Sequence, residues 1–355
     1  MVKFQFVFKL ITIGIALTSA KTSNASDVSD GPYIAVKDNS YHIEWVCNSK
    51  ANKQVVTTAK PIGFRKCGLF SNVHSQENQN YVIEYTGDFD VAAMSDFHGQ
   101  FDLMMSILKN NGIVDDKGEW TFGNGHFVIT GDIFDRGEKV TEILWFIYEL
   151  ERQAEKAGGR VHLLLGNHEV MVLNGDLRYL HPKYVEVARI LNTPFEDLIG
   201  KSTILGDWLR SKPVLVKVND MLFAHGGFHP ELAEQKRSLE EINQVFKEHL
   251  VKRELPKPRE GFAQYLHKRN GPIWYRGYFK DDGAHEAEIE LLLKHFDIKH
   301  LVVGHTSQKQ IETRFKGKVI AIDSSIKRGE YGEVLLIRKG KMLRGNPQGK
   351  QEPLK

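Results

Sequence analysis

The sequence predicts an α/β fold, in which mixed central β-sheets are layered with flanking helices and a small β-rich addition precedes this core. From residue 90 onward, short apolar runs alternate with amphipathic stretches. This pattern is typical of strands buried on both faces that alternate with helices. Hairpin patterns in the second half of the chain predict that the sheets contain antiparallel as well as parallel pairs.

Each expected strand is an apolar run bounded by polar residues. These runs occupy residues 90–96, 126–132, 160–167 and 299–306, and the hairpins occupy residues 214–225 and 333–345. Helical periodicity predicts helices over residues 100–109, 138–157, 231–250 and 285–296. A capping-box spacing with Pro194 at the first helical position predicts that a further helix begins there.

The region before residue 90 contains no motif that indicates chemistry. Residues 26–40 are polar and are expected to be loose, whereas residues 41–90 alternate apolar and polar side chains between turn clusters, which predicts short strands. We therefore divide the chain into a leader (1–25), a β-rich addition (26–89), a core domain (90–345) and a disordered polar tail (346–355).

The leader has the features of a secretory signal peptide. Lys3 and Lys9 supply positive charge, residues 10–20 form a short apolar run, and Ser23 and Ala25 suit a cleavage site. The run is shorter than the ~20 apolar residues that span a bilayer, and no later stretch is long and apolar enough. The alternative is a buried or anchoring N-terminal helix. We favour a cleaved signal peptide, which predicts a periplasmic or secreted protein without stable membrane insertion.

Composition favours a globular protein without a nucleic-acid partner. The 355 residues are 41% hydrophobic and 26% charged, which is enough to bury a large core. The net charge of +3 equals the three lysines of the leader, so the remainder is formally neutral and offers no attraction to nucleic acid. The two cysteines, Cys47 and Cys67, could form a disulfide in an oxidising compartment, or could be two unpaired core thiols.

Polar side chains follow five of the expected strands at the point where each strand ends. The segments read DFHGQ (96–100), GDIFDRG (131–137), GNHE (166–169), HGG (225–227) and GHT (304–306). Loops at one edge of an α/β sheet commonly form sites, and carboxylate, amide and imidazole groups bind manganese, iron or zinc. The pattern therefore predicts a centre for two divalent ions (Mn, Fe or Zn), ~3.5–4 Å apart, that binds a phosphate between them.

These segments resemble the signature set of the calcineurin-like metallophosphoesterases, and the resemblance covers residues 90–333. DFHGQ and GDIFDRG are similar to the protein Ser/Thr phosphatase branch. The leader and WYRG (274–277) are most similar to the Shewanella-like protein phosphatases, which include bacterial enzymes of the cold-active protein tyrosine phosphatase type. The resemblance implies a layered metallophosphoesterase core and makes residues 90–345 the catalytic domain.

The resemblance also implies a role for each residue of the motifs. The implied metal ligands are Asp96 and His98 for the first ion, Asp132 as a bridge, and Asn167, His225 and His305 for the second ion. The implied catalytic residues are His168, oriented by Asp135 and placed to protonate the leaving group, and Arg136 and Arg276, which would contact the phosphate.

Neighbouring polar residues receive no such role. Glu169 is interpreted as a supporting residue, Asp323 as a turn residue, and His229 stays unassigned. Leu165 stands where Ser/Thr phosphatases carry an arginine, and their C-terminal groove segment is missing. These departures separate the chain from that branch.

The expected function is metal-dependent hydrolysis of phosphate monoesters by direct attack of a hydroxide that bridges the two ions. The expected substrate is phosphoprotein, on phosphotyrosine and also phosphoserine or phosphothreonine, or a small phosphate monoester. The alternative is a phosphodiesterase or nucleotide pyrophosphatase on the same scaffold. A non-catalytic binding protein is disfavoured, because every ligand position of the motif set is filled.

Overall fold

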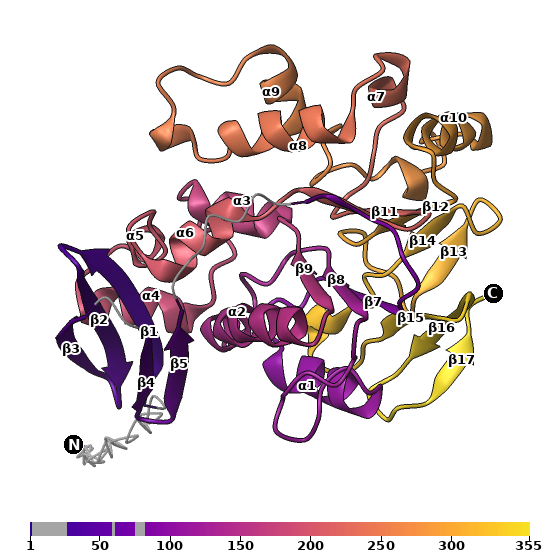
Figure 1. Ribbon diagram of the computed structural model, residues 1–355. Helices are drawn as coiled ribbons and strands as arrows, with labels where there is room; N and C mark the ends of the chain where they lie inside the picture. The colour runs from indigo at the N-terminus through magenta and orange to yellow at the C-terminus, as the bar shows by residue number, and fades with distance from the viewer. Residues whose placement is uncertain (2–26, 59–60, 75–81) are drawn as a thin grey trace.

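The computed structural model describes Met1 and residues 27–58, 61–74 and 82–355 (Figure 1). The expected signal peptide lies outside the described residues. From residue 90 onward the chain folds as predicted from its apolar runs, into mixed sheets flanked by helices (Figure 1).

Two mixed six-stranded sheets form the core of the described chain. The first has the order β17-β16-β15-β7-β8-β9, with β7 (Val91–Met94), β8 (His126–Ile129), β9 (Arg160–Leu163), β15 (Val334–Arg338), β16 (Lys341–Gly345) and β17 (Gln351–Pro353). The second has the order β13-β14-β12-β11-β10-β6, with β6 (Glu84–Tyr85), β10 (Leu215–Val218), β11 (Met221–Ala224), β12 (His300–Val303), β13 (Glu312–Arg314) and β14 (Val319–Ala321). Strands β7, β8 and β9 run parallel, as do β11, β12 and β14.

Strand β7 is apolar at every position because both of its faces are buried. Val91 and Ala93 belong to a buried cluster that also contains Val216 and Phe223 of the second sheet. Ala92 and Met94 belong instead to the larger cluster that includes the helices. Because side chains alternate between the two faces of a strand, one face packs against the other sheet and the opposite face packs against helices.

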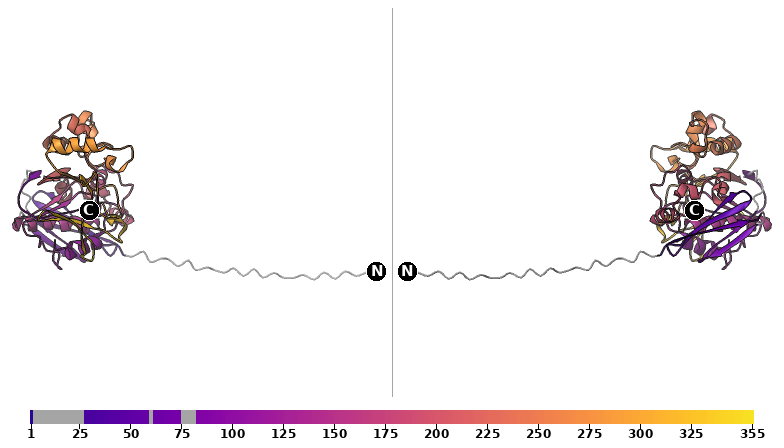
Figure 2. Two further views of the ribbon diagram at one scale, coloured as in Figure 1. Left: turned by 90° about the vertical axis from the view of Figure 1, so that its right-hand side faces the viewer. Right: turned by 90° about the vertical axis from the view of Figure 1, so that its left-hand side faces the viewer.

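The helices cover the outer faces of this double sheet. They are α1 (Phe101–Asn110), α2 (Val140–Lys156), α3 (Asn167–Leu173), α4 (Pro182–Leu191), α5 (Phe195–Leu198), α6 (Ile204–Ser211), α7 (Glu231–Glu234), α8 (Leu239–Glu248), α9 (Gly261–Leu266) and α10 (Glu286–Phe296). Helix α10 is tied to the second sheet, since Lys217 of β10 donates a hydrogen bond of 3.0 Å to the Phe296 carbonyl. Helices α7, α8 and α9 lie at one end of the molecule, beyond the sheets (Figures 1 and 2).

A β-rich addition precedes the core, as predicted. It comprises the sheet β1 (Asp30–Lys37), β2 (Ser40–Cys47) and β3 (Lys50–Thr57), and the hairpin β4 (Ile62–Lys66) and β5 (Leu69–Val73). The addition lies beside α2 and α4 (Figure 1). There the buried Asp30 carboxylate accepts a hydrogen bond from Thr141 at 3.0 Å and pairs with the Lys183 ammonium at 2.5 Å. Cys47 and Cys67 form a disulfide that joins β2 to the β4–β5 turn.

Two expectations about the addition were wrong. The stretch 26–40 was expected to be loose, but within its described part β1 (Asp30–Lys37) pairs with β2 and lies largely buried. The addition also does not extend to residue 89, because β6 pairs in parallel with β10 and so belongs to the second core sheet. The pairing of β6 depends on a strand far along the chain. The pairing of β1 is local, because a two-residue turn at Asp38 and Asn39, both with positive φ, joins β1 to β2 in a hairpin.

Two further expectations were wrong near the C-terminus. The stretch 231–250 is not one helix: Lys236 adopts a left-handed conformation, and α8 begins anew with Ser238 as its N-cap. Residues 346–355 are not a disordered tail, because β17 pairs with β16 and completes the edge of the first sheet. A turn at Asn346 and an ion pair of 2.8 Å between Arg344 and Glu352 hold this polar strand in place.

None of the helices among the described residues is both long enough and apolar enough to cross a lipid bilayer.

Candidate metal centre and phosphate site

The sequence-predicted ligands converge at the carboxyl ends of neighbouring strands. Asp96 and His98 follow β7, Asp132 follows β8, Asn167 opens α3 after β9, and His225 and His305 follow β11 and β12. All six side chains are buried. Parallel strands β7, β8 and β9 end at one edge of the first sheet, and β11 and β12 end at the facing edge of the second, so the folding of the sheets brings these loops together.

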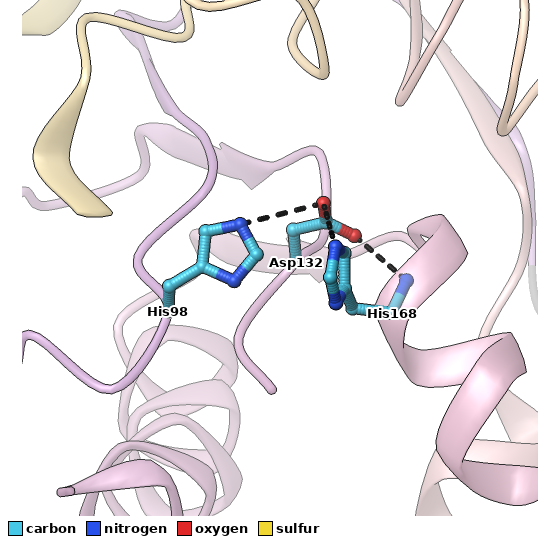
Figure 3. Close-up of side chains that lie close together, drawn as sticks. All are labelled: His98, Asp132 and His168. Carbon is cyan, nitrogen blue, oxygen red and sulfur yellow. Dashed lines mark hydrogen bonds and ion pairs between the residues drawn. The ribbon is translucent and has the colours of Figure 1, made fainter. Parts of the chain in front are cut away.

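Asp132 lies at the middle of the cluster. Its Oδ2 atom is 3.6 Å from His98 Nε2 (Figure 3). The same atom is 3.1 Å from His225 Nε2. His225 Nε2 is also 2.9 Å from Asn167 Oδ1 and 3.1 Å from His305 Nδ1. The predicted bridging residue therefore separates two groups of donor atoms, with Asp96 Oδ1 at 3.9 Å from His98 Nε2 in the first group.

The imidazole rings are oriented from behind by backbone carbonyls. The Nδ1–H group of His98 donates to Phe134 O at 2.7 Å, and that of His225 donates to Thr130 O at 2.9 Å. These bonds place the ring protons on Nδ1 and leave the Nε2 lone pairs facing Asp132. This is the arrangement by which proteins orient metal-binding histidines.

The nitrogen and oxygen atoms of the cluster suit divalent cations, because they have too few protons to satisfy one another by hydrogen bonds. His225 Nε2 lies within 3.1 Å of Asp132 Oδ2, Asn167 Oδ1 and His305 Nδ1, and even a protonated Nε2 could donate to only one of them. Burial and the nearby carboxylate of Asp323 raise the pKa of Asp96 to about 8, and burial lowers the pKa of His98 to about 3. Burial lowers the pKa of His225, but the charge of Asp132 outweighs it and raises this pKa to about 9. The buried carboxylates therefore draw a proton onto His225 when no other positive charge is present, and bound cations would supply that charge instead.

The backbone of these loops is unusual in its conformation. Asp96, His98, Asp132, Asp135 and His305 all have positive φ angles between 43° and 71°. Residues other than glycine seldom adopt this conformation, and such residues concentrate at functional sites. The loops therefore hold their side chains at the cluster against the ordinary preference of the backbone.

Close contact between two loops requires a glycine at position 166. A Cβ atom there would lie 2.3 Å from Asp132 Oδ1 and 2.6 Å from the Asp132 amide nitrogen. The Glu169 carboxylate fixes the same contact, because it accepts hydrogen bonds from the amides of Asp132 at 2.8 Å, Ile133 at 2.7 Å and Gly166 at 2.8 Å. Glu169 is thus the supporting residue that the sequence predicted, and it positions the Asp132 loop.

His168 and Asp135 form a pair beside the cluster. His168 Nδ1 is 2.5 Å from Asp135 Oδ2, and the His168 ring lies edge to face with that of His98 (Figure 3). The amide of His168 donates to Asp132 Oδ1 at 3.0 Å. Burial lowers the pKa of His168, but the negative charges of Asp132 and Asp135 outweigh it and raise this pKa above the usual value.

Two arginines lie near the cluster, in the GDIFDRG and WYRG motifs. Arg276 donates to the His305 carbonyl at 2.9 Å and to Thr306 Oγ1 at 3.1 Å, while Arg136 is exposed and its guanidinium lies 5.2 Å from the ring of Tyr179. Arg136 has no ion pair with any residue in the described ranges. Burial lowers the pKa of Arg276, but the charges of Asp96 and Asp132 oppose this, so its guanidinium faces the carboxylates of the centre.

Comparison with known proteins identifies the family. The model of the calcineurin-like phosphoesterases matches residues 89–309, which is more than half of the chain. The chain belongs to the calcineurin-like phosphoesterase family.

Relatives within and around this family cover most of the chain. An uncharacterized protein of Schizosaccharomyces pombe is 35% identical over 70% of this chain and 76% of its own length. Shewanella-like protein phosphatase 1 of Plasmodium berghei is 30% identical over 66% of this chain and 65% of its own. The crystal structure of a cold-active protein tyrosine phosphatase from a psychrophilic Shewanella species is 40% identical, covers 92% of this chain and 99% of its own, and has a TM-score of 0.87.

The chain is accordingly a metal-dependent phosphoric monoester hydrolase of the calcineurin-like family. Residues Asp96, His98, Asp132, Asn167, His225 and His305 would hold two divalent ions. When bound, these ions supply positive charge for the phosphate and an activated water. Glu169 positions the Asp132 loop and Asp135 orients His168. Arg136 and Arg276 would present charged donors to a bound phosphate.

One residue at the site carries no motif and was missed from the sequence. Tyr179 lies in the loop between α3 and α4, is 45% exposed, and its ring centroid is 5.4 Å from that of His168. The Tyr179 carbonyl accepts a hydrogen bond of 3.0 Å from the amide of Arg136. Its sequence neighbourhood gives no signal, because the contact joins a loop to the GDIFDRG motif more than forty residues earlier.

Proposed function

We propose that this phosphatase hydrolyses phosphotyrosine in proteins. The observation that carries the proposal is the place of Tyr179, whose exposed ring lies beside His168 and is contacted by the guanidinium groups of Arg136 and Arg178. Aromatic rings attract one another in offset or edge-to-face pairs, which contribute ~0.5–1.5 kcal/mol beyond burial. A phenyl ring attached to a phosphate at the centre would therefore meet an aromatic surface where the leaving group departs. The similarity to a protein tyrosine phosphatase supports the same substrate.

The pair of His168 and Asp135 supports a monoester as the substrate. A departing alkoxide or phenoxide needs a proton, and an imidazolium near the ester oxygen can donate it. The hydrogen bond to Asp135 fixes the ring and favours its charged form. Arg136 and Arg276 would bind the unesterified oxygens of the phosphate, which a monoester has in greater number than a diester.

A comparison of substrates tests the proposal directly. We expect higher kcat/KM for a phosphotyrosine peptide than for phosphoserine and phosphothreonine peptides of the same sequence, and little hydrolysis of bis-p-nitrophenyl phosphate. Tyr179→Ala should lower this preference by about 3- to 10-fold, as loss of an aromatic pair predicts, whereas Tyr179→Phe should retain it. Efficient diester cleavage, or equal rates on the three peptides in the wild type, would contradict the proposal.

The identity of the ions is part of the proposal. Oxygen and imidazole donors of the kind gathered at Asp132 accept manganese, iron and zinc. We propose that two ions of this group bind. Elemental analysis of protein purified without added metal should find about two such ions per chain, and one ion or none in active protein would overturn this assignment.

We also propose that the protein acts in the periplasm or outside the cell. The apolar leader with its small-residue cleavage site supports export, as does the Cys47–Cys67 disulfide, because disulfides persist in oxidising compartments. Cell fractionation with N-terminal sequencing should recover a mature form that begins after Ala25. Recovery of uncleaved protein from the cytoplasm would contradict the proposal.

A further inference from the structure

A large cavity adjoins the phosphate site on the side of Arg276. Its volume is about 1260 Å³, and Arg276 forms part of its wall. Trp274, another wall residue, places its ring 5.7 Å from that of the predicted ligand His305. The cavity exceeds the roughly 300–1,000 Å³ of typical small-molecule sites. It therefore has room for much more than the phosphate that Arg276 would contact.

Basic side chains predominate in the wall of this cavity. Lys268, Arg269, Arg276 and Lys280 line it, against Asp282 and Glu288 as the acidic residues. We call this cavity, defined by these four basic residues, the basic groove. The Glu288 carboxylate accepts the His285 amide at 2.7 Å and keeps its charge, so the four basic residues outnumber the two acidic ones. The groove is therefore positively charged, although the chain without its leader is formally neutral.

Three of the basic residues are free to receive a ligand. Lys268, Arg269 and Lys280 are exposed, and none of them forms an ion pair or side-chain hydrogen bond with another residue in the described part of the chain. Nearby lysines behave differently: Lys316 and Lys318 both pair with Glu286 of α10 at 3.0 Å. The unpaired cations are thus gathered where the surface is hollow.

The positive surface continues beyond the groove. A second cavity of about 640 Å³ shares Gln264, His267 and Lys268 with it. This second cavity adds Lys252, Lys257 and Arg259 and has no acidic residue in its wall. A ligand that begins at the phosphate site and follows the surface would therefore meet positive charge over a long path.

We infer that the basic groove binds acidic residues that flank the phosphorylated residue of a polypeptide substrate. This inference rests on the proposed protein phosphatase function and specifies its substrate class. Charge complementarity carries it: carboxylates along the peptide would face Lys268, Arg269 and Lys280 while the phosphate lies beside Arg276. Exposed charge pairs each contribute modestly, so the selectivity should come from several contacts together.

Tyr275 of the groove wall is not available to a single-stranded nucleic acid, whose bases would stack on exposed aromatic faces. Tyr275 is buried, and its ring packs edge to face with those of His229 at 5.3 Å and Tyr278 at 5.0 Å. Trp274 and Tyr265 of the same wall are half-buried, so the test includes a nucleic acid.

The test uses phosphotyrosine peptides that differ only in their flanking residues. One series carries a run of glutamates, glutamines or lysines before the phosphotyrosine, and a second series carries the run after it. We expect kcat/KM at low salt to be at least ~10-fold higher for the glutamate peptide than for the glutamine peptide in one of the series, mainly through KM. The advantage should shrink at high salt.

A matched pair of triple variants locates the effect. Lys268→Gln with Arg269→Gln and Lys280→Gln should reduce the preference for the glutamate peptide to within ~2-fold. The control variant Lys37→Gln with Lys117→Gln and Lys341→Gln removes the same charge from exposed positions outside both cavities, and should keep the preference. Circular dichroism and thermal melting check that both variants fold.

Each adverse result has a distinct meaning. Equal rates on all flanking sequences, or equal loss in both triple variants, would overturn the role of the groove and leave the proposed phosphatase function intact. Activity on p-nitrophenyl phosphate without activity on any phosphopeptide would instead overturn the proposed function. A 5′-phosphorylated oligonucleotide that is dephosphorylated faster than the glutamate peptide, with loss in the groove variant, would assign the groove to nucleic acid and overturn the inference.

Discussion

Asp132 is the residue on which the geometry of the centre depends. Its Oδ2 atom lies between His98 and His225, while its Oδ1 atom accepts the amide of His168. The Asp132 carboxylate thus contacts both groups of metal-binding side chains and also His168, which is expected to protonate the leaving group. A substitution that alters only Oδ2 would test the binding of cations by Asp132 without removing the hydrogen bond from the His168 amide to Oδ1.

Asp132→Asn makes that change, because the amide keeps an oxygen for the His168 amide and replaces Oδ2 by an NH₂ group that cannot bind a cation. We expect ion content to fall at both positions and kcat/KM to fall by more than ~100-fold, since even residues behind the ligands cost 10- to 100-fold. Elemental analysis beside steady-state kinetics measures both, with the exposed Asp116→Asn as a control. Two tightly held ions and normal turnover in Asp132→Asn would show that the carboxylate does not bridge.

His168 allows acid catalysis to be separated from binding. His168→Ala should retain its ions and lose ~10²–10⁴-fold in kcat on phosphoserine, whose alkoxide needs a proton to leave. The loss should be much smaller on p-nitrophenyl phosphate, because nitrophenolate leaves without one. Asp135→Asn should show the same trend more weakly, since it removes only the charge that orients the ring. Equal losses on both substrates, with ions in place, would make His168 a binding residue.

At the scale of elements, the N-terminal strands depend on a cross-link as well as on packing. The Cys47–Cys67 disulfide closes a sequence separation of 20 residues between β2 and the β4–β5 turn. Trp45 and Phe64 pack edge to face at 5.0 Å close to it. The predicted choice between a disulfide and two free thiols is thus decided by the packing of the β4–β5 hairpin against the β1–β2–β3 sheet, which brings the cysteines together.

Replacing both cysteines by serine should lower the free energy of unfolding of the addition by about 3 kcal/mol, as the entropy of a closed loop of this size predicts. Urea unfolding of oxidised wild type and of the double variant measures the difference, and wild type treated with a reductant should match the variant. Free thiols found by titration of denatured, unreduced wild type would remove the basis of this prediction.

At the scale of the whole molecule, the centre links the two core sheets. Asp96, Asp132 and Asn167 come from the first sheet, and His225 and His305 come from the second. Cations bound by residues of both sheets bind only the folded chain, so they stabilise it by mass action. Removing them should therefore affect stability as well as activity.

Prolonged chelation should abolish activity and lower the melting temperature, and added manganese should restore both. An ion present at 100 times its dissociation constant contributes about 2.7 kcal/mol. Calorimetry and p-nitrophenyl phosphate hydrolysis on the same samples measure the two effects. Full activity in protein that elemental analysis shows to be free of metal would end the two-metal assignment.

The sequence by itself determined the mixed α/β core and the composition of the centre. Apolar runs buried on both faces mark strands directly, and each motif stands at the end of such a run, so DFHGQ, GDIFDRG, GNHE, HGG and GHT could be placed at one edge before any contact was known. Local sequence patterns were enough to place these residues, because each motif comes directly after the strand that positions it.

Only the tertiary structure decided the features that depend on a distant partner. The tail became β17 because β16 offered it an edge, and β6 joined the core because β10 did. Tyr179 reached His168, and Lys268, Arg269 and Lys280 came to line one cavity beside Arg276, through loops that carry no periodic pattern. The pairing of edge strands and the packing of loops are stabilised by contacts with residues far away in the sequence. Local sequence patterns do not reveal these contacts.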